Sequence, residues 1–193
     1  MRRLFVGLLA AAATATAAQE LPQTVELSRT TLQRCGDVQL RVFAGLINIG
    51  RAGLYLQDCG QHERVMGDVA KQYSVHLARS ADGDRLTRMA REGLEENHTE
   101  ATRDRLAATF SCMTGAYRDA EKGRRYDVRY LPGHGLQLWL DEELLADCPC
   151  GPDGARYFSI WFGDEPFNTE MKETLLEQAR NAASRPPAGE SAR

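Results

Sequence analysis

The chain lacks many of the features from which function is usually inferred. It contains no G-x-S-x-G, no P-loop, no H-E-x-x-H and no C-x-x-C-H, so the sequence signatures of several hydrolase, nucleotide-binding, metalloprotease and c-type haem classes are missing. The longest apolar run, Leu4–Ala13, has about ten residues, and no segment reaches the ~18 apolar residues of a membrane-spanning helix. There is also no basic stripe with interleaved aromatic residues. We therefore expect no nucleic-acid partner and no transmembrane segment in the mature chain.

Histidine is scarce, with four in the whole chain, and none stands in a pattern that identifies a metal or haem ligand. We interpret His76 as a structural residue of a strand and His98 as a residue near a helix end. His62 and His134 lie in a polar loop and a turn. The acidic run at 141–143 is interpreted as a solvated turn and not as a pair of catalytic carboxylates.

The N-terminus has the pattern of a secretory signal peptide. Arg2 and Arg3 precede an apolar run of about ten residues, and small residues follow at 15–18. We expect residues 1–18 to be cleaved and the protein to reach a bacterial periplasm; an uncleaved N-terminal anchor is the alternative. Cleavage would remove two arginines and no acid, so the formal charge would change from −3 to −5. The expected domain then spans 19–183, followed by a disordered tail at 184–193 rich in Pro, Gly and Ala.

Five cysteines would enter this oxidising compartment, and an odd number leaves at least one unpaired. We expect a disulfide between Cys35 and Cys59, at opposite ends of a strand-rich segment. Cys148 and Cys150 are too close in sequence for an unstrained bridge to each other. A metal site at these two residues would need further ligands that the nearby sequence does not supply. Structural or free cysteines are the simpler interpretation.

The last third of the chain predicts a hairpin followed by two helices. Apolar and polar residues alternate on both sides of the turn at 132–135, which is typical of antiparallel strands with one wet face. The segment 157–162 is apolar on nearly every side, which indicates a short buried helix that Gly163 can end in a left-handed conformation. Asn168 is expected to cap the final helix. Its inner face would hold Met171, Leu175, Ala179 and Ala182.

The middle of the chain predicts strands followed by two helices. Residues 40–56 are typical of one or two long strands and 72–78 of another, and helices are expected to start near Asp82 and Thr99. On the 40–56 strand, alternation groups one face as Asn48, Gly50, Ala52, Leu54 and Leu56. Small residues on that face leave room above it, either for close helix packing or for a ligand. The order of elements indicates an α+β fold, with helices on one face of an antiparallel sheet.

Three stretches, in this order and spacing, are similar to motifs of one protein family. Residues 50–56 (GRAGLYL) resemble an A-x-L-Y-L strand, 130–135 (YLPGHG) a Y-x-P-G-x-G turn, and 160–166 (IWFGDEP) a W-x-G-x-x-P end. These are motifs of the chalcone isomerase-like proteins, in particular of the exported bacterial branch. The resemblance covers about residues 25–179. It implies an open-faced β-sandwich, in which a large antiparallel sheet carries a layer of helices on one face with a ligand cleft between them.

The resemblance also implies that the catalytic groups of the family have been lost. In its plant enzymes, which cyclise a chalcone to a flavanone, an arginine stabilises the phenolate while Thr, Tyr, Asn and Ser/Thr side chains line the cleft. The positions that match these four polar residues are Gly50, Leu86, Gly93 and Ser159 or Ile160. A cleft without those polar groups cannot orient a chalcone in the same way. We therefore expect no chalcone isomerase activity.

The arginine of the family has a possible counterpart in Arg41. Arg51 is a rival, although alternation places it on the face opposite Gly50.

Some non-catalytic relatives resemble fatty-acid binders and others haem binders, so the expected function is binding of a small amphipathic ligand of either class. Arg41 would pair with a carboxylate, unless it forms an ordinary surface salt bridge. Asn48, Gly50, Ala52 and Leu54 would line the floor. Haem is the possible cofactor. The alternatives are an isomerase of the intramolecular lyase type and an envelope interaction protein without a small ligand, whose cleft would be filled by side chains.

Overall fold

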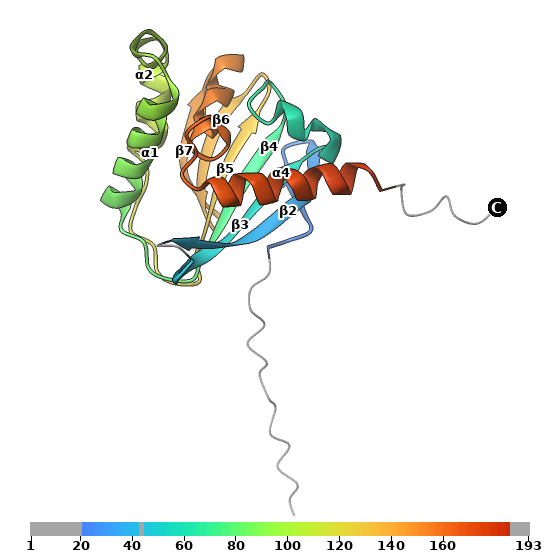
Figure 1. Ribbon diagram of the computed structural model, residues 1–193. Coiled ribbons are helices and arrows are strands. Elements are labelled where there is room, and N and C mark those ends of the chain that lie inside the picture. Colours follow the sequence, from blue (N-terminus) through green and yellow to red (C-terminus); the bar gives the residue numbers. More distant parts are fainter. Residues whose placement is uncertain (1–20, 43–44, 186–193) are drawn as a thin grey trace, which may run out of the picture.

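The computed structural model describes residues 21–42 and 45–185 (Figure 1). The signal peptide expected at 1–18 and all but the first two residues of the tail expected at 184–193 lie outside this part of the chain. Ser184 still belongs to the final helix as its C-cap. No helix within the described ranges is long and apolar enough to cross a membrane.

The described residues contain one antiparallel sheet of seven strands, in which each strand pairs with the next one along the chain. This confirms the antiparallel sheet expected from alternation. The segment 40–56 holds the end of one strand and the whole of the next. The strands are β1 (Thr24–Leu27), β2 (Thr30–Val42), β3 (Ile47–Leu56), β4 (Lys71–Leu77), β5 (Arg125–Leu131), β6 (Gly135–Leu140) and β7 (Glu143–Pro149).

The long helices begin at the capping residues that the sequence indicates. The side chains of Asp82, Thr99 and Asn168 accept hydrogen bonds from the backbone N–H three residues later, which satisfies one of the unpaired donors of each first turn. These helices are α1 (Gly83–Asn97), α2 (Glu100–Thr114) and α4 (Thr169–Ala183). The shorter helical segments are η1 (Cys59–Arg64), η2 (Pro152–Phe158) and α3 (Ser159–Phe162).

The helices cover one face of the curled sheet, here called the inner face, and the main core lies between them (Figure 1). Helix α4 packs on β2 and β3, and α2 packs on β7. The apolar segment 157–162 is buried, as expected, although its first two residues belong to η2. The expected left-handed end at Gly163 is wrong: its φ is −72° and its ψ is −172°, which is extended backbone. The chain leaves this helix by straightening.

Two disulfides tie the helical layer to the sheet. Cys35 of β2 is joined to Cys59 of η1, with Cα atoms 5.3 Å apart, which is the pairing that the sequence suggested. Cys112 of α2 is joined to Cys148 of β7, with Cα atoms 6.1 Å apart. Cys150 is left as a free thiol, and burial raises its pKa. The sequence analysis did not identify the second pair, because it links segments that meet only in the folded protein.

A β-bulge in the β2–β3 hairpin changes which residues face the helices. Leu40 pairs with Gly50, but the next residue, Arg41, pairs with Asn48, so Ile49 is an extra residue on β3. An extra residue reverses the alternation on the far side of the bulge. The expected grouping of Asn48 with Gly50 on one face is therefore wrong, and Ile47 and Ile49 turn toward the helices instead.

Candidate functional site

A cavity of about 560 Å³ lies between the inner face of the sheet and helices α1 and α3. This volume is within the range of about 300–1,000 Å³ that is common for small-molecule sites. Most of the wall is apolar. The lining residues include Leu40, Val42, Ile47, Ile49, Tyr73, Val75, Leu77, Leu86, Met89, Ala90, Tyr117, Tyr126, Val128, Ile160, Trp161 and Phe167.

The floor of the cavity is made by the ends of four neighbouring strands, β2 to β5. Leu40 and Val42 come from β2 and Val75 and Leu77 from β4, at alternate positions along each strand. Ile49 joins this floor only because of the bulge. Tyr73 of β4 and Tyr126 and Val128 of β5 complete a floor of aliphatic and aromatic side chains without a charged group.

The roof is made by α1, α3 and the segment after α3. Leu86 and Met89 project from α1, and Trp161 projects from α3 and stacks on Tyr73 of the sheet with ring centroids 4.4 Å apart. Both rings line the cavity, so this aromatic contact joins its roof to its floor.

Three tyrosines line the cavity, and the hydroxyl of each is already hydrogen bonded within the protein. Tyr73 donates to the sulfur of Met171 at 3.0 Å, and Tyr126 donates to the carbonyl oxygen of Arg118. The Tyr117 hydroxyl is 3.2 Å from that of Tyr157. Burial raises the pKa of Tyr117 to about 12 and raises the pKa of Tyr73 and Tyr126 above the usual value for tyrosine. These side chains stay neutral near pH 7 and are poor candidates for a general base.

Two of the residues expected to contact a ligand lie outside the cavity wall. The Arg41 side chain is exposed and donates hydrogen bonds to Gln39 Oε1 and to the carbonyl oxygen of Gly45. Asn48 pairs with Arg41 across the strands, so it too lies off the inner face. The rival Arg51 forms an ion pair with Asp37, which agrees with the expectation that it faces away from the cleft.

The other three expected residues lie on the inner face, but within packed structure. Ala52 and Leu54 are fully buried in the core, where α4 covers β2 and β3. A Cβ on Gly50 would collide with the carbonyl oxygen of His76 on the neighbouring strand. Helix packing, one of the two explanations considered for these small residues, accounts for Ala52 and Leu54, whereas close approach of β4 accounts for Gly50.

The positions that correspond to catalytic side chains in the family carry no free polar group into the cavity. Leu86 presents only carbon to it, and Gly93 packs against Ile160. The Ser159 hydroxyl lies 3.0 Å from Nε2 of His98. It therefore hydrogen bonds to a residue that does not line the cavity. Burial also lowers the pKa of His98. These contacts have structural roles.

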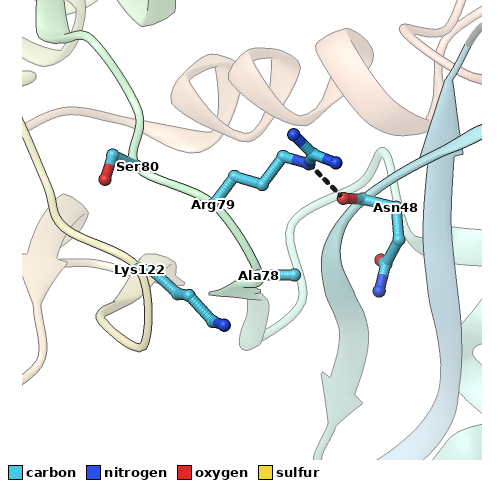
Figure 2. A pocket seen from close by; sticks show the side chains of 5 residues that line it. All are labelled: Asn48, Ala78, Arg79, Ser80 and Lys122. Atoms are coloured by element: carbon cyan, nitrogen blue, oxygen red, sulfur yellow. Dashed lines mark hydrogen bonds between the residues drawn. The ribbon is translucent and has the colours of Figure 1, made fainter.

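The polar part of the site is a rim at the β4–α1 connection, which the sequence analysis did not identify. Arg79, Ser80, Asp82 and Arg85 line the cavity at this end. A shallow hollow adjoins it, lined by Asn48, Ala78, Arg79, Ser80 and Lys122 (Figure 2). Arg79 and Ser80 belong to both, so the apolar cavity and the basic hollow meet at these two residues. Their place in an irregular loop left no periodic signal.

The described part of the chain shows no group of three or more His, Cys, Asp or Glu side chains that could hold a metal ion. The metal interpretation of Cys148 and Cys150 is wrong for Cys148, which is in a disulfide. Among described residues, neither a histidine nor a cysteine lines the cavity. The site is therefore suited to an organic ligand held by apolar contact.

Comparison with known proteins agrees with the observed architecture. The sequence profile of a family described as chalcone isomerase-like matches residues 13–177. Among solved structures, a fatty-acid binding protein of Arabidopsis thaliana superposes with a TM-score of 0.61 over 84% of this chain and 94% of its own, at 14% sequence identity. No curated protein matches the sequence. At this identity the structural likeness concerns the fold alone.

Proposed function

Because the chain belongs to the chalcone isomerase-like family, we propose that it binds a fatty acid in the cavity between sheet and helices, without catalysing a reaction. The observation that carries this proposal is the composition of the cavity wall. Branched aliphatic and aromatic side chains surround about 560 Å³, and the charged side chains of the site gather at one end. An apolar interior with a polar rim matches a molecule with a hydrocarbon chain and one polar group.

The lack of available acid–base groups supports binding without catalysis. The three tyrosine hydroxyls in the wall are engaged by protein partners, and the matched catalytic positions hold Leu86, Gly93 and a hydrogen-bonded Ser159. The fatty-acid binding protein of Arabidopsis, which has this fold, supports the choice of fatty acid over haem as the first ligand to test. The open cavity argues against an interaction protein whose cleft is filled.

We further propose that residues 1–18 direct export of the protein to the periplasm and are then cleaved. The two disulfides support this, because such bonds persist in oxidising compartments such as the periplasm. N-terminal sequencing of protein recovered from a periplasmic extract should give a chain that starts at Gln19. Recovery of the intact N-terminus from the cytoplasmic fraction alone would contradict this proposal.

Binding can be tested with delipidated protein and palmitate, by native mass spectrometry and isothermal titration calorimetry. We expect one palmitate per chain. Met89→Trp would place a large ring from α1 into the cavity and should weaken binding at least tenfold. The matched control is Arg88→Trp, which adds the same ring at an exposed neighbouring position of α1 and should leave the affinity unchanged.

Three outcomes would overturn the proposal. One is the absence of palmitate binding to the wild-type protein, and another is equal affinity in Met89→Trp and Arg88→Trp when both variants retain the wild-type melting temperature. The third is a protein-dependent loss of chalcone absorbance, which would favour an isomerase. A stoichiometric Soret band with haemin and no palmitate binding would favour haem.

A further inference from the structure

The cavity and the basic hollow are adjacent and differ in chemistry. Arg79 and Ser80 line both. The inner part is mostly hydrocarbon, and the outer part contains two cations, Arg79 and Lys122, together with Asn48 (Figure 2). None of the residues that line the outer hollow is acidic. Glu121 precedes Lys122 in the sequence but is not part of this lining.

The outer hollow presents hydrogen-bond donors that the described residues leave available. Arg79 Nε donates to the carbonyl oxygen of Asn48 at 3.2 Å, and no acceptor for its two terminal nitrogens is found in the described ranges. Asn48 Oδ1 accepts from the Gly50 N–H, which leaves the Nδ2 group of the amide as a donor. Lys122 Nζ likewise has no acceptor among the residues described. A ligand group with several acceptor oxygens and negative charge would satisfy these donors.

The backbone holds the two sides of the hollow together. Ala81 and Ala120 exchange both backbone hydrogen bonds, at 2.8 and 2.9 Å. Gly123, whose φ is +92°, donates to the carbonyl oxygen of Leu77 at 2.8 Å. Lys122 therefore lies on a short loop that is anchored on one side to the β4–α1 connection and on the other to the end of β4. This fixes the Lys122 backbone relative to Arg79 in the absence of a ligand.

We propose that the natural ligand is a single-chain lipid whose head group carries a phosphate monoester, with its acyl chain in the cavity and its phosphate in the basic hollow. This inference rests on the proposed function for the acyl part only. A fatty-acid carboxylate at the cavity rim would reach Arg79 and Arg85, and Asp82 would offset one of these charges. It would leave Lys122 and Asn48 unused. A phosphate placed past Ser80 would use Arg79, Lys122 and Asn48 together, through the arginine fork and the compact lysine charge.

The test compares three ligands with the same acyl chain: 1-palmitoyl lysophosphatidic acid, palmitate, and neutral monopalmitoylglycerol, each below its critical micelle concentration. We expect lysophosphatidic acid to bind at least tenfold more tightly than monopalmitoylglycerol, and this advantage to shrink as salt is raised from 50 to 500 mM. Lys122→Gln and Arg79→Gln should each weaken lysophosphatidic acid binding about five- to tenfold. Lys122→Gln, which lies outside the acyl cavity, should leave the affinity for monopalmitoylglycerol unchanged. Arg88→Gln, on the exposed side of α1, is the charge-matched control and should change neither.

The outcomes separate this inference from the proposed function. If all three lipids bind equally and Lys122→Gln has no effect, the phosphate site is refuted while the acyl cavity stands. If no lipid binds, the proposed function fails as well. Inorganic phosphate is the remaining arm: without an acyl chain it should bind at least a hundredfold more weakly than lysophosphatidic acid. Equal affinity would make the hollow a site for free phosphate and overturn the lipid assignment.

Discussion

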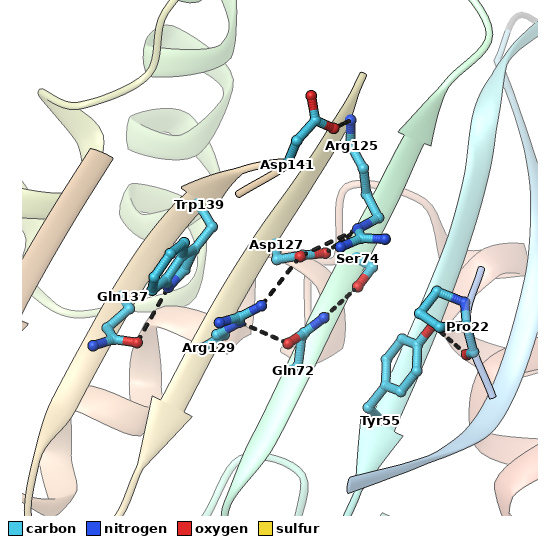
Figure 3. Close-up of polar contacts among 10 residues, drawn as sticks. All are labelled: Pro22, Tyr55, Gln72, Ser74, Arg125, Asp127, Arg129, Gln137, Trp139 and Asp141. Carbon is cyan, nitrogen blue, oxygen red and sulfur yellow. Dashed lines mark hydrogen bonds and ion pairs between the residues drawn. The ribbon is translucent and has the colours of Figure 1, made fainter. Parts of the chain in front are cut away.

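The two faces of the sheet bury different kinds of side chain. On the inner face, apolar residues are covered by helices and still leave a cavity. On the outer face, Asp127, Gln72 and Ser74 are completely buried by their neighbours within a polar network (Figure 3). Asp127 accepts hydrogen bonds from Arg125 at 3.0 Å and from Arg129 at 3.4 Å.

This outer network joins side chains of β4 and β5 by hydrogen bonds. Arg129 also donates to Gln72, which donates in turn to Ser74. The Arg129 guanidinium lies 4.6 Å from the centre of the Trp139 ring, which adds a cation–π contact. The comparison shows two results of burial. On the outer face the polar groups of this network hydrogen bond to one another and are not left free for a ligand, whereas on the inner face incompletely filled apolar surface leaves a cavity that can bind one. The predictions below test this difference.

The largest effect is expected from Asp127→Ala, which would leave two arginines packed together without their shared carboxylate. Removing one member of a buried ion pair typically costs about 3–5 kcal/mol in the free energy of unfolding, and we expect about 3 kcal/mol here. Urea denaturation measures this loss. Glu143→Ala removes an exposed pair with Arg118 and should cost no more than about 1 kcal/mol. If the two variants were equally stable, the outer network would have no structural role.

The next prediction compares two positions on the inner side of the sheet, one in the packed core and one at the cavity wall. Leu54→Ala would open a void where α4 packs on the sheet and should cost about 2–4 kcal/mol in unfolding free energy. Leu86→Ala, at the wall of an existing cavity, should cost only about 1 kcal/mol, because its side chain is already incompletely packed. Thermal unfolding of both variants without ligand checks the contrast. Equal losses would mean that the cavity is closed in solution.

A third prediction concerns Lys71, a completely buried amine beside the Tyr130 and Phe158 rings. Burial lowers its pKa to about 7, although Asp68 acts in the opposite direction. Between pH 7 and the unfolded value of 10.5, the unfolded chain holds a proton that the folded chain has lost. The free energy of unfolding should therefore rise with pH, by at most about 1.4 kcal/mol per unit for one proton.

Denaturation between pH 7 and 8 tests this, below the ordinary pKa values of the cysteine thiol and of tyrosine. Lys71→Met should flatten the dependence. An unchanged slope in that variant would assign the proton to another group.

The smallest effect is expected at an exposed ion pair that lies apart from the Asp127 network. Arg51 is half exposed and pairs with Asp37, which also lies 3.5 Å from Arg34. Arg51→Ala should therefore reduce the free energy of unfolding by less than about 1 kcal/mol, and palmitate affinity should be unchanged. A loss comparable to that of Asp127→Ala would show that an exposed ion pair stabilises the protein as much as the buried network does.

Local sequence patterns were sufficient for most of the architecture. Alternation in 125–140 gave the β5–β6 hairpin, and Asp82, Thr99 and Asn168 marked the helix starts, because capping and periodicity depend on near neighbours in the chain. The cavity wall was predicted poorly for a physical reason. Which side chains of a strand face inward depends on how the strands pair, and no local pattern in residues 40–50 indicates a β-bulge. The basic rim depends on two loops that meet only in the folded protein.

That extra residue, Ile49, gives the hairpin a simple means of changing what the protein accepts. An insertion of one residue on β2 opposite Ile49, between Leu40 and Arg41, would restore plain alternation, turn the Asn48 amide toward the cavity and withdraw the isoleucines from it. The number of residues in a single hairpin, and not the identity of any side chain, would then determine whether the cavity floor is apolar or can form hydrogen bonds. Relatives that differ by one residue here should differ in the polarity of the compounds they retain during purification, even where every aligned residue is the same.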